Sequence, residues 1–117
     1  MNNYCNDIIN SIDEKCIILK IKQDFINKYN GNIYEASRHE WRLNIKNANK
    51  ADIVLISFNG IIEEVYTNLS WYKENNRLSF AGVQAQESIR SKYYKKRIPS
   101  MYITNRSKNP CKYINIL

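Results

Sequence analysis

The sequence predicts an α+β fold: a small, mostly antiparallel, curled sheet with two or three helices. The strongest observation is the segment 51–66, in which two β-branched runs flank Asn59-Gly60. This pair suits a type I′ turn, which needs positive φ at both central residues. The run Ile53–Ile56 is apolar without alternation, which predicts a central strand covered on both faces. A length of 117 residues supports one core, so residues 1–117 are expected to form a single domain.

The first third of the chain predicts a helix, a strand and a connection. Residues 3–15 place Ile8, Ile9 and Ile12 at helical spacing, which predicts a short amphipathic helix. Residues 16–22 are apolar and then alternate, as in a strand. Residues 23–32 are expected to form a connection that ends in turn-forming Asn-Gly-Asn.

A capping-box pattern predicts the next helix at residues 37–48. Ser37 would be the N-cap, and Glu40 would return a hydrogen bond from the third helical position. Trp41, Ile45 and Ala48 would then form one apolar stripe.

The rest of the chain alternates between strands and short connections. In chain order the expected elements are the hairpin strand 61–66, a loop at 67–76, a strand at 77–81 ended by Gly82, a helix at 86–96, a strand at 100–104, a basic loop at 105–110 and a last strand at 111–116.

The positive charge is concentrated at the C-terminal end. The formal net charge is +7, and residues 88–117 contain eight Lys and Arg but no Asp or Glu. Residues 1–87 contain ten basic and eleven acidic residues. This distribution is typical of a protein with an anionic partner, most often nucleic acid, although solubility alone can also explain it.

Cysteine usage and hydropathy exclude several classes. Cys5, Cys16 and Cys111 lack metal-ligand spacing, and the single histidine is His39, so no metal site and no cofactor are expected. We expect three buried, reduced thiols. The chain has no apolar run of about 18 residues, and its N-terminus lacks the layout of a signal peptide, so no membrane span and a cytoplasmic location are expected.

No catalytic motif is present, and the polar candidates allow two interpretations. The sequence has no Walker loop, GxGxxG or GxSxG pattern. Arg38 would contact a phosphate with Glu35 orienting it, or the two would form a structural ion pair. His39 and Glu40 are adjacent on the expected helix, so their side chains would diverge.

Basic and aromatic residues alternate in the segment 91–97, a mixture that suits backbone contact and base stacking. Trp71 would be exposed in the predicted loop and would stack on a base. A solvated helix face and ordinary core packing are the alternatives. The predicted nucleic-acid-binding residues are Arg38, Arg42, Trp71, Lys92, Tyr94, Lys95, Lys96, Arg97 and Arg106. A pocket would be formed by Glu35, Trp41 and Asn109.

Four segments carry a resemblance to a family of small bacterial domains. They are Leu19-Lys20-Ile21, Tyr34-Glu35-Ala36-Ser37-Arg38-His39-Glu40-Trp41-Arg42, Phe58-Asn59-Gly60-Ile61-Ile62 and Asn109-Pro110-Cys111-Lys112-Tyr113-Ile114-Asn115. In order and spacing the chain resembles the segment often found C-terminal to GIY-YIG nuclease domains of the LEM-3-like type, although His39 replaces a small residue. The topology is also similar to the PUA-like group (ASCH, EVE, YTH). Because the GIY-YIG motif is absent, the resemblance implies an accessory module that helps to recognise nucleic acid, and it does not imply nuclease activity.

These observations favour a non-catalytic nucleic-acid-binding module whose basic face comes from the C-terminal third of the chain. One alternative is a phage or mobile-element protein that binds and inhibits a host nuclease or defence protein. Another is a small nuclease or nucleotide-binding protein built on Glu35, Arg38 and His39. DNA and RNA both remain open as the partner.

Overall fold

The computed structural model describes residues 7–102 and 110–116. In chain order its elements are β1 (Cys16–Lys20), α1 (Gln23–Lys28), α2 (Ile33–Arg38), α3 (Ile45–Ala48), β2 (Ile53–Phe58), β3 (Ile61–Glu74), β4 (Arg77–Gln84), α4 (Glu87–Tyr93), a 3-10 turn (Ser100–Tyr102) and β5 (Cys111–Ile114).

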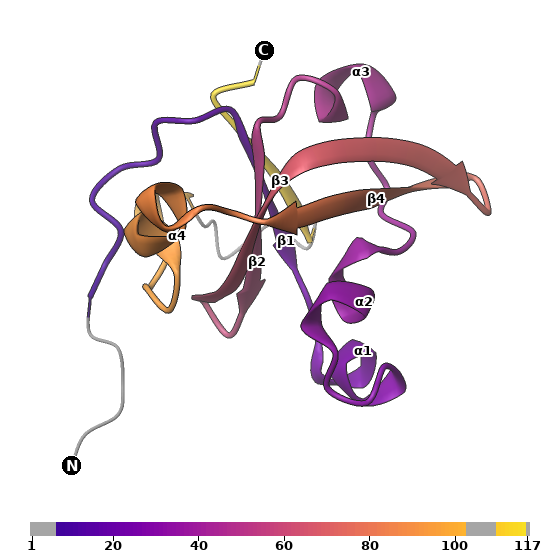
Figure 1. Ribbon diagram of the computed structural model, residues 1–117, viewed down its shortest axis with the longest axis horizontal. Coiled ribbons are helices and arrows are strands. Elements are labelled where there is room, and N and C mark those ends of the chain that lie inside the picture. The colour runs from indigo at the N-terminus through magenta and orange to yellow at the C-terminus, as the bar shows by residue number, and fades with distance from the viewer. Residues whose placement is uncertain (1–6, 103–109, 117) are drawn as a thin grey trace.

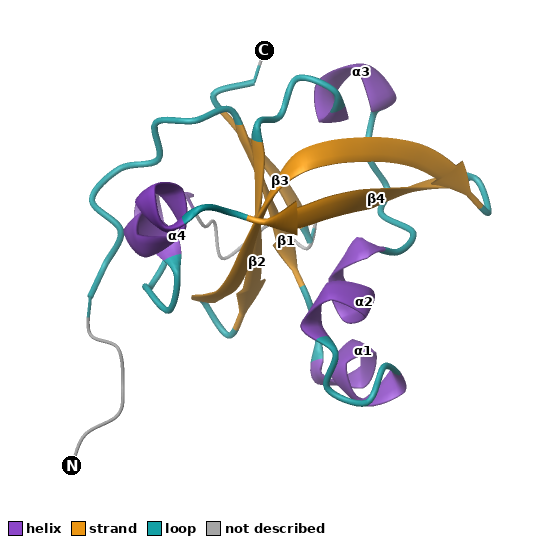
Figure 2. Cartoon of the chain, in the orientation of Figure 1, coloured by secondary structure: helices purple, strands orange, loops and turns teal. Residues whose placement is uncertain are grey.

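The five strands form one sheet in the order β4-β3-β2-β1-β5, with β4 and β5 at its edges (Figures 1 and 2). β1 and β2 are parallel, and the other three neighbouring pairs are antiparallel. The predicted α+β class with a mostly antiparallel, curled sheet is confirmed. The described residues contain four α-helices rather than two or three, and none of these helices is long and apolar enough to cross a membrane.

The sheet is covered on both faces, so it has two hydrophobic cores. Side chains alternate along β1 and β2, with Ile18 and Leu55 in one core and Leu19 and Ile56 in the other. Figure 1 shows α4 on one side of these strands and α1, α2 and α3 on the other. The predicted central position of Ile53–Ile56 is therefore confirmed, because all four residues are fully buried.

The β2–β3 hairpin forms around Asn59 and Gly60, as predicted. Their φ angles are 53° and 80°, the left-handed values that a type I′ turn requires. This part of the fold follows from local sequence.

The predicted loop at 67–76 is wrong, because β3 continues through Trp71 to Glu74 and pairs with β4. A register shift between Thr67 and Ser70 contains Asn68, whose φ is 53°. This bulge interrupts the alternation of side chains that would have revealed the strand. Only Asn75 and Asn76 form the turn, both with positive φ.

Gly82 does not end β4, which runs on to Gln84. A Cβ atom at Gly82 would lie 3.0 Å from the backbone oxygen of Thr67 and 3.1 Å from the side chain of Leu69. Glycine is therefore needed here because the bulged strand β3 approaches closely.

Residues 7–15 are not helical, so the predicted N-terminal helix is wrong over its described part. The Ile9 amide donates to the Arg97 carbonyl at 3.0 Å, and the Arg97 amide donates to the Asp7 carbonyl at 2.9 Å. Ile9 and Ile12 are buried, whereas Ile8 is 55% exposed. An extended segment that pairs with Arg97 thus buries Ile9 and Ile12 without forming a helix.

The single helix predicted at 37–48 is also wrong, because within this range only the end of α2 and the four residues of α3 are helical. Ser37 lies inside α2, where its hydroxyl donates to the Ile33 carbonyl, and the N-cap of α2 is Asn32. The helix ends at Arg38, since the backbone of Trp41 pairs with Leu78 through hydrogen bonds of 2.7 and 2.9 Å. Tertiary pairing has overridden a local capping pattern. The connection expected at 23–32 likewise contains a helix, α1, before its turn.

The C-terminal third agrees better with prediction. The helix expected at 86–96 is α4, which is shorter, and the strand expected at 111–116 is β5. The strand expected at 100–104 is wrong where it is described, because residues 100–102 form a 3-10 turn. Residues 103–109, which include most of the predicted basic loop, lie outside the described residues.

Candidate functional site

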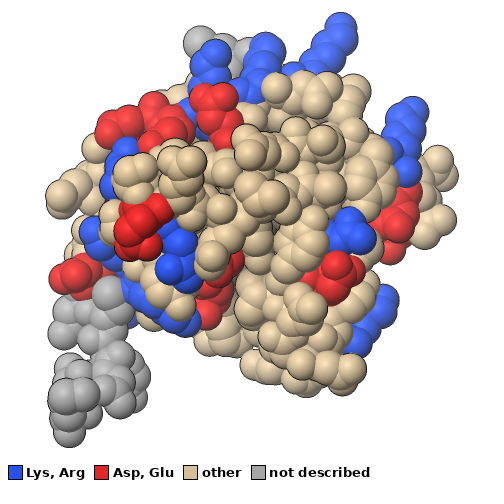
Figure 3. Space-filling view, viewed as in Figure 1, with Lys and Arg blue, Asp and Glu red and all other residues tan. Residues whose placement is uncertain are grey.

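The cations of α4 are paired with acidic residues from other parts of the chain. Arg90 Nε lies 2.8 Å from Glu64 on β3, and Lys92 Nζ lies 2.8 Å from Glu14. In the turn after α4, Lys95 Nζ lies 2.6 Å from Glu63. Figure 3 shows acidic and basic atoms interleaved on this side of the molecule.

These contacts shift the pKa values of Glu14, Glu64, Arg90, Lys92 and Lys95 towards their charged forms. Burial opposes ionisation of Glu64, but hydrogen bonds from Arg90, the Val65 amide and Gln84 together outweigh it and lower the pKa of this carboxyl. The Glu63 carboxylate raises the pKa of Lys95 through a hydrogen bond. Much of the positive charge predicted for this face is therefore balanced within the protein.

The remaining predicted residues of this face differ in their surroundings. Tyr94 lies beneath the Arg90 guanidinium, 3.6 Å from ring centroid to Cζ, so its face is already occupied. Lys96 and Arg97 form no ion pair with any described residue. Arg106 and Asn109 lie outside the described residues.

Arg38 and Glu35 form the predicted ion pair, at 3.0 Å from Nε to Oε2. The Arg38 guanidinium also donates to the Tyr72 hydroxyl and, at 3.3 Å, to the Phe80 carbonyl on the outer edge of β4. Arg38, on α2, thus satisfies a backbone carbonyl of the edge strand β4. These contacts match the structural interpretation of the Glu35–Arg38 pair.

His39 joins α2 to the β3–β4 hairpin. Its Nε2 lies 3.1 Å from Glu35, its Nδ1 lies 2.9 Å from Glu74, and its ring stacks on Tyr29 at 5.5 Å. Hydrogen bonds from Ser79 and then from His39 lower the pKa of Glu74. The described residues contain no group of three or more side chains that could hold a metal ion.

Both tryptophans belong to the core on the α1–α3 side. Trp41 is buried, and its indole nitrogen donates to the Ser37 carbonyl at 2.6 Å. Trp71 is partly buried in β3 with its ring 5.2 Å from that of Phe80, rather than exposed in a loop. Its indole nitrogen has no hydrogen-bond partner among the described residues.

Two hollows open where the end of the β3–β4 hairpin meets α1, α2 and the segment before α3. The larger hollow has a volume of about 340 Å³ and is lined by Phe25, Lys28, Tyr29, Ala36, His39, Glu40 and Arg77. The smaller has a volume of about 150 Å³ and is lined by Trp41, Arg42, Leu43, Ile45, Lys73, Asn76, Arg77 and Leu78. Arg77 lines both hollows.

The rims of these hollows carry four cations, which we call the tip cations: Lys28, Arg42, Lys73 and Arg77. All four are exposed, and none forms an ion pair with a described acidic residue. Lys28 lies over the ring of Tyr29 at 5.5 Å. The tip cations are therefore open to an external anion.

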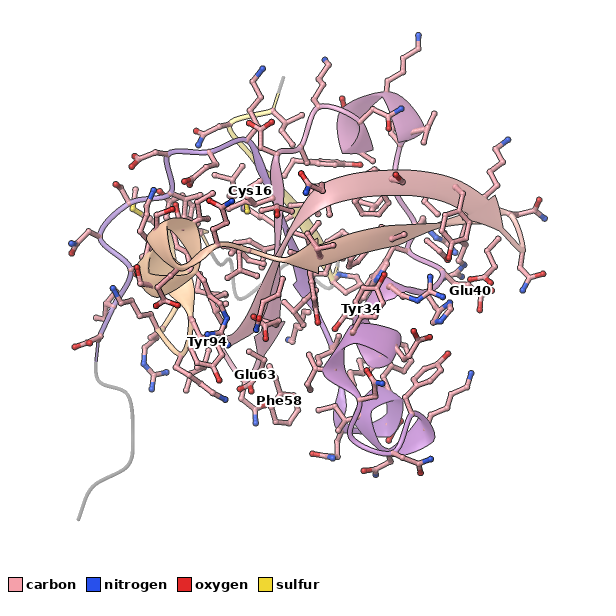
Figure 4. The ribbon with its side chains drawn as sticks, in the orientation of Figure 1. Cys16, Tyr34, Glu40, Phe58, Glu63 and Tyr94 are labelled. Carbon is pink, nitrogen blue, oxygen red and sulfur yellow. The ribbon has the colours of Figure 1, made fainter. Side chains whose placement is uncertain are left out.

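Glu40 is held in an unusual backbone conformation on the wall of the larger hollow. Its φ is 59°, its amide donates to Ser79 Oγ at 2.9 Å, and its carboxylate accepts from Asn75 Nδ2 at 3.0 Å. Figure 4 shows Glu40 on the hairpin side of the molecule, far from Glu63 and Tyr94. Glu40 directly follows the C-cap residue of α2, a position at which helices commonly place a left-handed residue.

Sequence reasoning anticipated only Arg42 among the tip cations. It assigned Glu40 to a helix cap, and it singled out neither Lys28 nor Arg77. The one local signal is the spacing of Phe25 and Lys28, which are three residues apart in α1 and therefore share a face.

The buried cysteines offer no reactive group. Burial raises the pKa of Cys16 far above its ordinary value and raises that of Cys111 to about 11. A thiol with a raised pKa is a poor nucleophile at neutral pH. The predicted burial is confirmed for these two residues, whereas Cys5 lies outside the described residues.

Comparison of the chain with protein-family models, with curated proteins and with solved structures returned no match.

Proposed function

We propose that this protein binds nucleic acid through the tip cations, as a non-catalytic module. The observation that carries the proposal is the set of four exposed cations without acidic partners among the described residues, around two hollows. Phosphate groups are the anions that such a set recognises best, since Lys and Arg release condensed counterions when they bind a nucleic-acid backbone.

The two arginines among the tip cations can also form directional hydrogen bonds to phosphate. Arg42 and Arg77 can each present a planar fork of donors to two phosphate oxygens. The smaller hollow lies between them and is lined by both. Adjacent phosphates of one strand would suit this arrangement.

The C-terminal face predicted from the sequence is retained as a secondary surface. Lys96 and Arg97 would add to the attractive field, while Arg90, Lys92 and Lys95 are held by carboxylates. The resemblance to segments that accompany nuclease domains supports an accessory role. A cytoplasmic location, where nucleic acid is accessible, is part of the proposal.

Fluorescence anisotropy with labelled single- and double-stranded DNA and RNA, at about 50 and 200 mM salt, tests the proposal. We expect binding that weakens steeply with salt, and the preferred polymer identifies the partner. Arg42→Glu with Arg77→Glu is expected to reduce the salt dependence by about two units of slope. Absence of binding to all four polymers at the lower salt concentration would overturn the proposal in favour of a protein partner.

A further inference from the structure

The larger hollow is suited to a ligand of the size of one nucleobase. Its volume of about 340 Å³ lies at the lower end of the range for small-molecule pockets, roughly 300 to 1,000 Å³. A duplex is far too large to enter such a space. A base of a nucleic acid can therefore enter it only when that base is unpaired.

One aromatic ring on the wall remains available for stacking. Phe25 is 39% exposed and meets Trp41 only edge to face, at 6.4 Å and 75°. Tyr29 is already stacked on His39. Base stacking on an exposed aromatic ring is a common way to bind a single strand.

The Glu40 carboxylate on the wall of the hollow favours hydrogen-bond donors on the ligand. The Glu40 carboxylate is an acceptor only, and Asn75 and Ser79 hold the residue in place through its side chain and its amide. Guanine offers two adjacent donors, N1–H and N2–H, on its Watson–Crick edge. Uracil and thymine place acceptors on both sides of their single donor, and adenine and cytosine place an acceptor beside theirs. A carboxylate therefore fits guanine best among the bases.

Two of the tip cations line the same hollow as Glu40. These are Lys28 and Arg77, so a base that enters the hollow would bring its flanking phosphates close to both. The Watson–Crick edge of guanine is free only when the base is unpaired. Stacking on Phe25 and recognition of the Watson–Crick edge thus both require an unpaired base.

From this arrangement we infer that the larger hollow binds one unpaired guanine of a single-stranded nucleic acid, with Phe25 stacking on the base and Glu40 accepting from its Watson–Crick edge. This inference rests on the proposed function and names the ligand of the same site. It assigns to Glu40 the role of choosing the base and to the tip cations the role of supplying affinity.

The test uses short oligothymidylate and oligouridylate probes with one central position varied among the four bases. We expect the guanine probe to bind about tenfold more tightly than the others, the discrimination that a bidentate base contact provides. Glu40→Gln should remove this preference, so that the guanine probe binds no more tightly than the unsubstituted probe. The control is Glu87→Gln, which removes the same charge from an exposed position on α4 and should retain the preference.

The outcomes separate this inference from the proposed function. If neither these probes nor a DNA or RNA duplex binds at about 50 mM salt, the proposed function fails, whereas binding of a duplex alone overturns only the present inference. If the probes bind equally, if Glu40→Gln keeps the guanine preference, or if a duplex containing the same guanine competes equally, only the present inference is overturned. Should Glu40→Gln fold poorly in a thermal melt, Glu40→Gly replaces it, because glycine accepts the left-handed conformation and also removes the carboxylate.

Discussion

The α4 side and the hairpin end of this molecule are both rich in cations, but they differ in what those cations contact. On the α4 side, Arg90, Lys92 and Lys95 each have a carboxylate within 2.8 Å. At the hairpin end, the four tip cations have no such partner among the described residues. The number of positive charges in a segment therefore says less about binding than the number left unpaired after folding.

The difference arises from long-range contacts. Lys92 and Glu14 are 78 residues apart in sequence, and they meet because the N-terminal segment crosses beside α4. The acid-free C-terminal segment receives its acidic partners from elsewhere in the chain. At the hairpin end, the nearby acids are used differently: Glu35 and Glu74 contact His39, and Glu40 contacts Asn75.

The largest expected effect is on affinity for nucleic acid. Arg42→Glu with Arg77→Glu should weaken binding on the order of a hundredfold, as expected for the loss of two charge-assisted contacts. Lys95→Glu with Lys96→Glu makes the same change in net charge on the α4 side and should have a much smaller effect. The measurement is anisotropy at fixed salt, after thermal melting shows that both variants are folded. Equal losses in the two double variants would mean that net charge alone governs binding.

A second comparison uses two arginines and measures stability. Arg90→Ala should lower the free energy of unfolding by about 1–2 kcal/mol, because Glu64 loses a charged donor in a partly buried position. Arg77→Ala should change it by less than about 0.5 kcal/mol, as is usual at an exposed position without partners. Urea denaturation measures both values. If Arg77→Ala lowers the free energy of unfolding as much as Arg90→Ala does, Arg77 is a structural residue and not a free cation.

The α4 side should also dominate the loss of stability in acid. Burial raises the pKa of Glu14 and of Glu64. The hydrogen bonds to each carboxyl, chiefly from Lys92 to Glu14 and from Arg90 to Glu64, together lower the pKa by more than burial raises it. Both pKa values in the folded protein therefore lie below the ordinary value of 4.5. A carboxyl with a lowered folded pKa stabilises the protein above its unfolded pKa, and this stability is lost as the pH falls through the folded value.

Between about pH 7 and about pH 3, Glu14→Gln with Glu64→Gln should therefore lose less stability than the parent protein, because the two carboxyls with lowered pKa values are gone. Urea denaturation at the two pH values gives this difference. Glu87→Gln is the control and should lose as much stability in acid as the parent. An unchanged acid loss in the double variant would show that these pairs do not stabilise the fold.

The sequence predicted those parts of the fold that depend on neighbouring residues. Asn59-Gly60 fixed a turn, and the unbroken apolar run of β2 marked a central strand. The second half of β3 was missed because the bulge at Asn68 hides its alternation. The capping pattern at Ser37 gave a wrong helix start because the backbone of Trp41 pairs with Leu78, a residue far away in the chain.

The candidate site was less predictable than the fold for a related reason. Arg42 was identified from its residue type, but only the tertiary arrangement shows that Arg77 joins it, while Arg90 is neutralised by Glu64. Free and paired cations look the same in a sequence. Their difference is a property of the folded chain.

The smallest expected effect compares two strained residues, one in each region. Glu40 and Lys95 are both left-handed with φ of 59°, a conformation that costs a non-glycine residue roughly 1 kcal/mol. Glycine relieves this cost but gains entropy in the unfolded chain, so Glu40→Gly and Lys95→Gly should each raise the free energy of unfolding by only about 0.5 kcal/mol. The side-chain hydrogen bonds that these substitutions remove, to Asn75 and to Glu63, are exposed to solvent and stabilise the fold little.

Thermal and urea denaturation measure this gain, and the nucleic-acid assay separates the two positions. Lys95 follows the end of α4, where a left-handed residue is ordinary and glycine is the usual choice, so Lys95→Gly should leave binding unchanged. Glu40 follows α2 at the wall of a hollow, and Glu40→Gly should abolish the guanine preference even as it stabilises the protein. Stabilisation without any change in binding at Glu40 would mean that its strain belongs to the turn alone, as at Lys95, and that the hollow does not read the base.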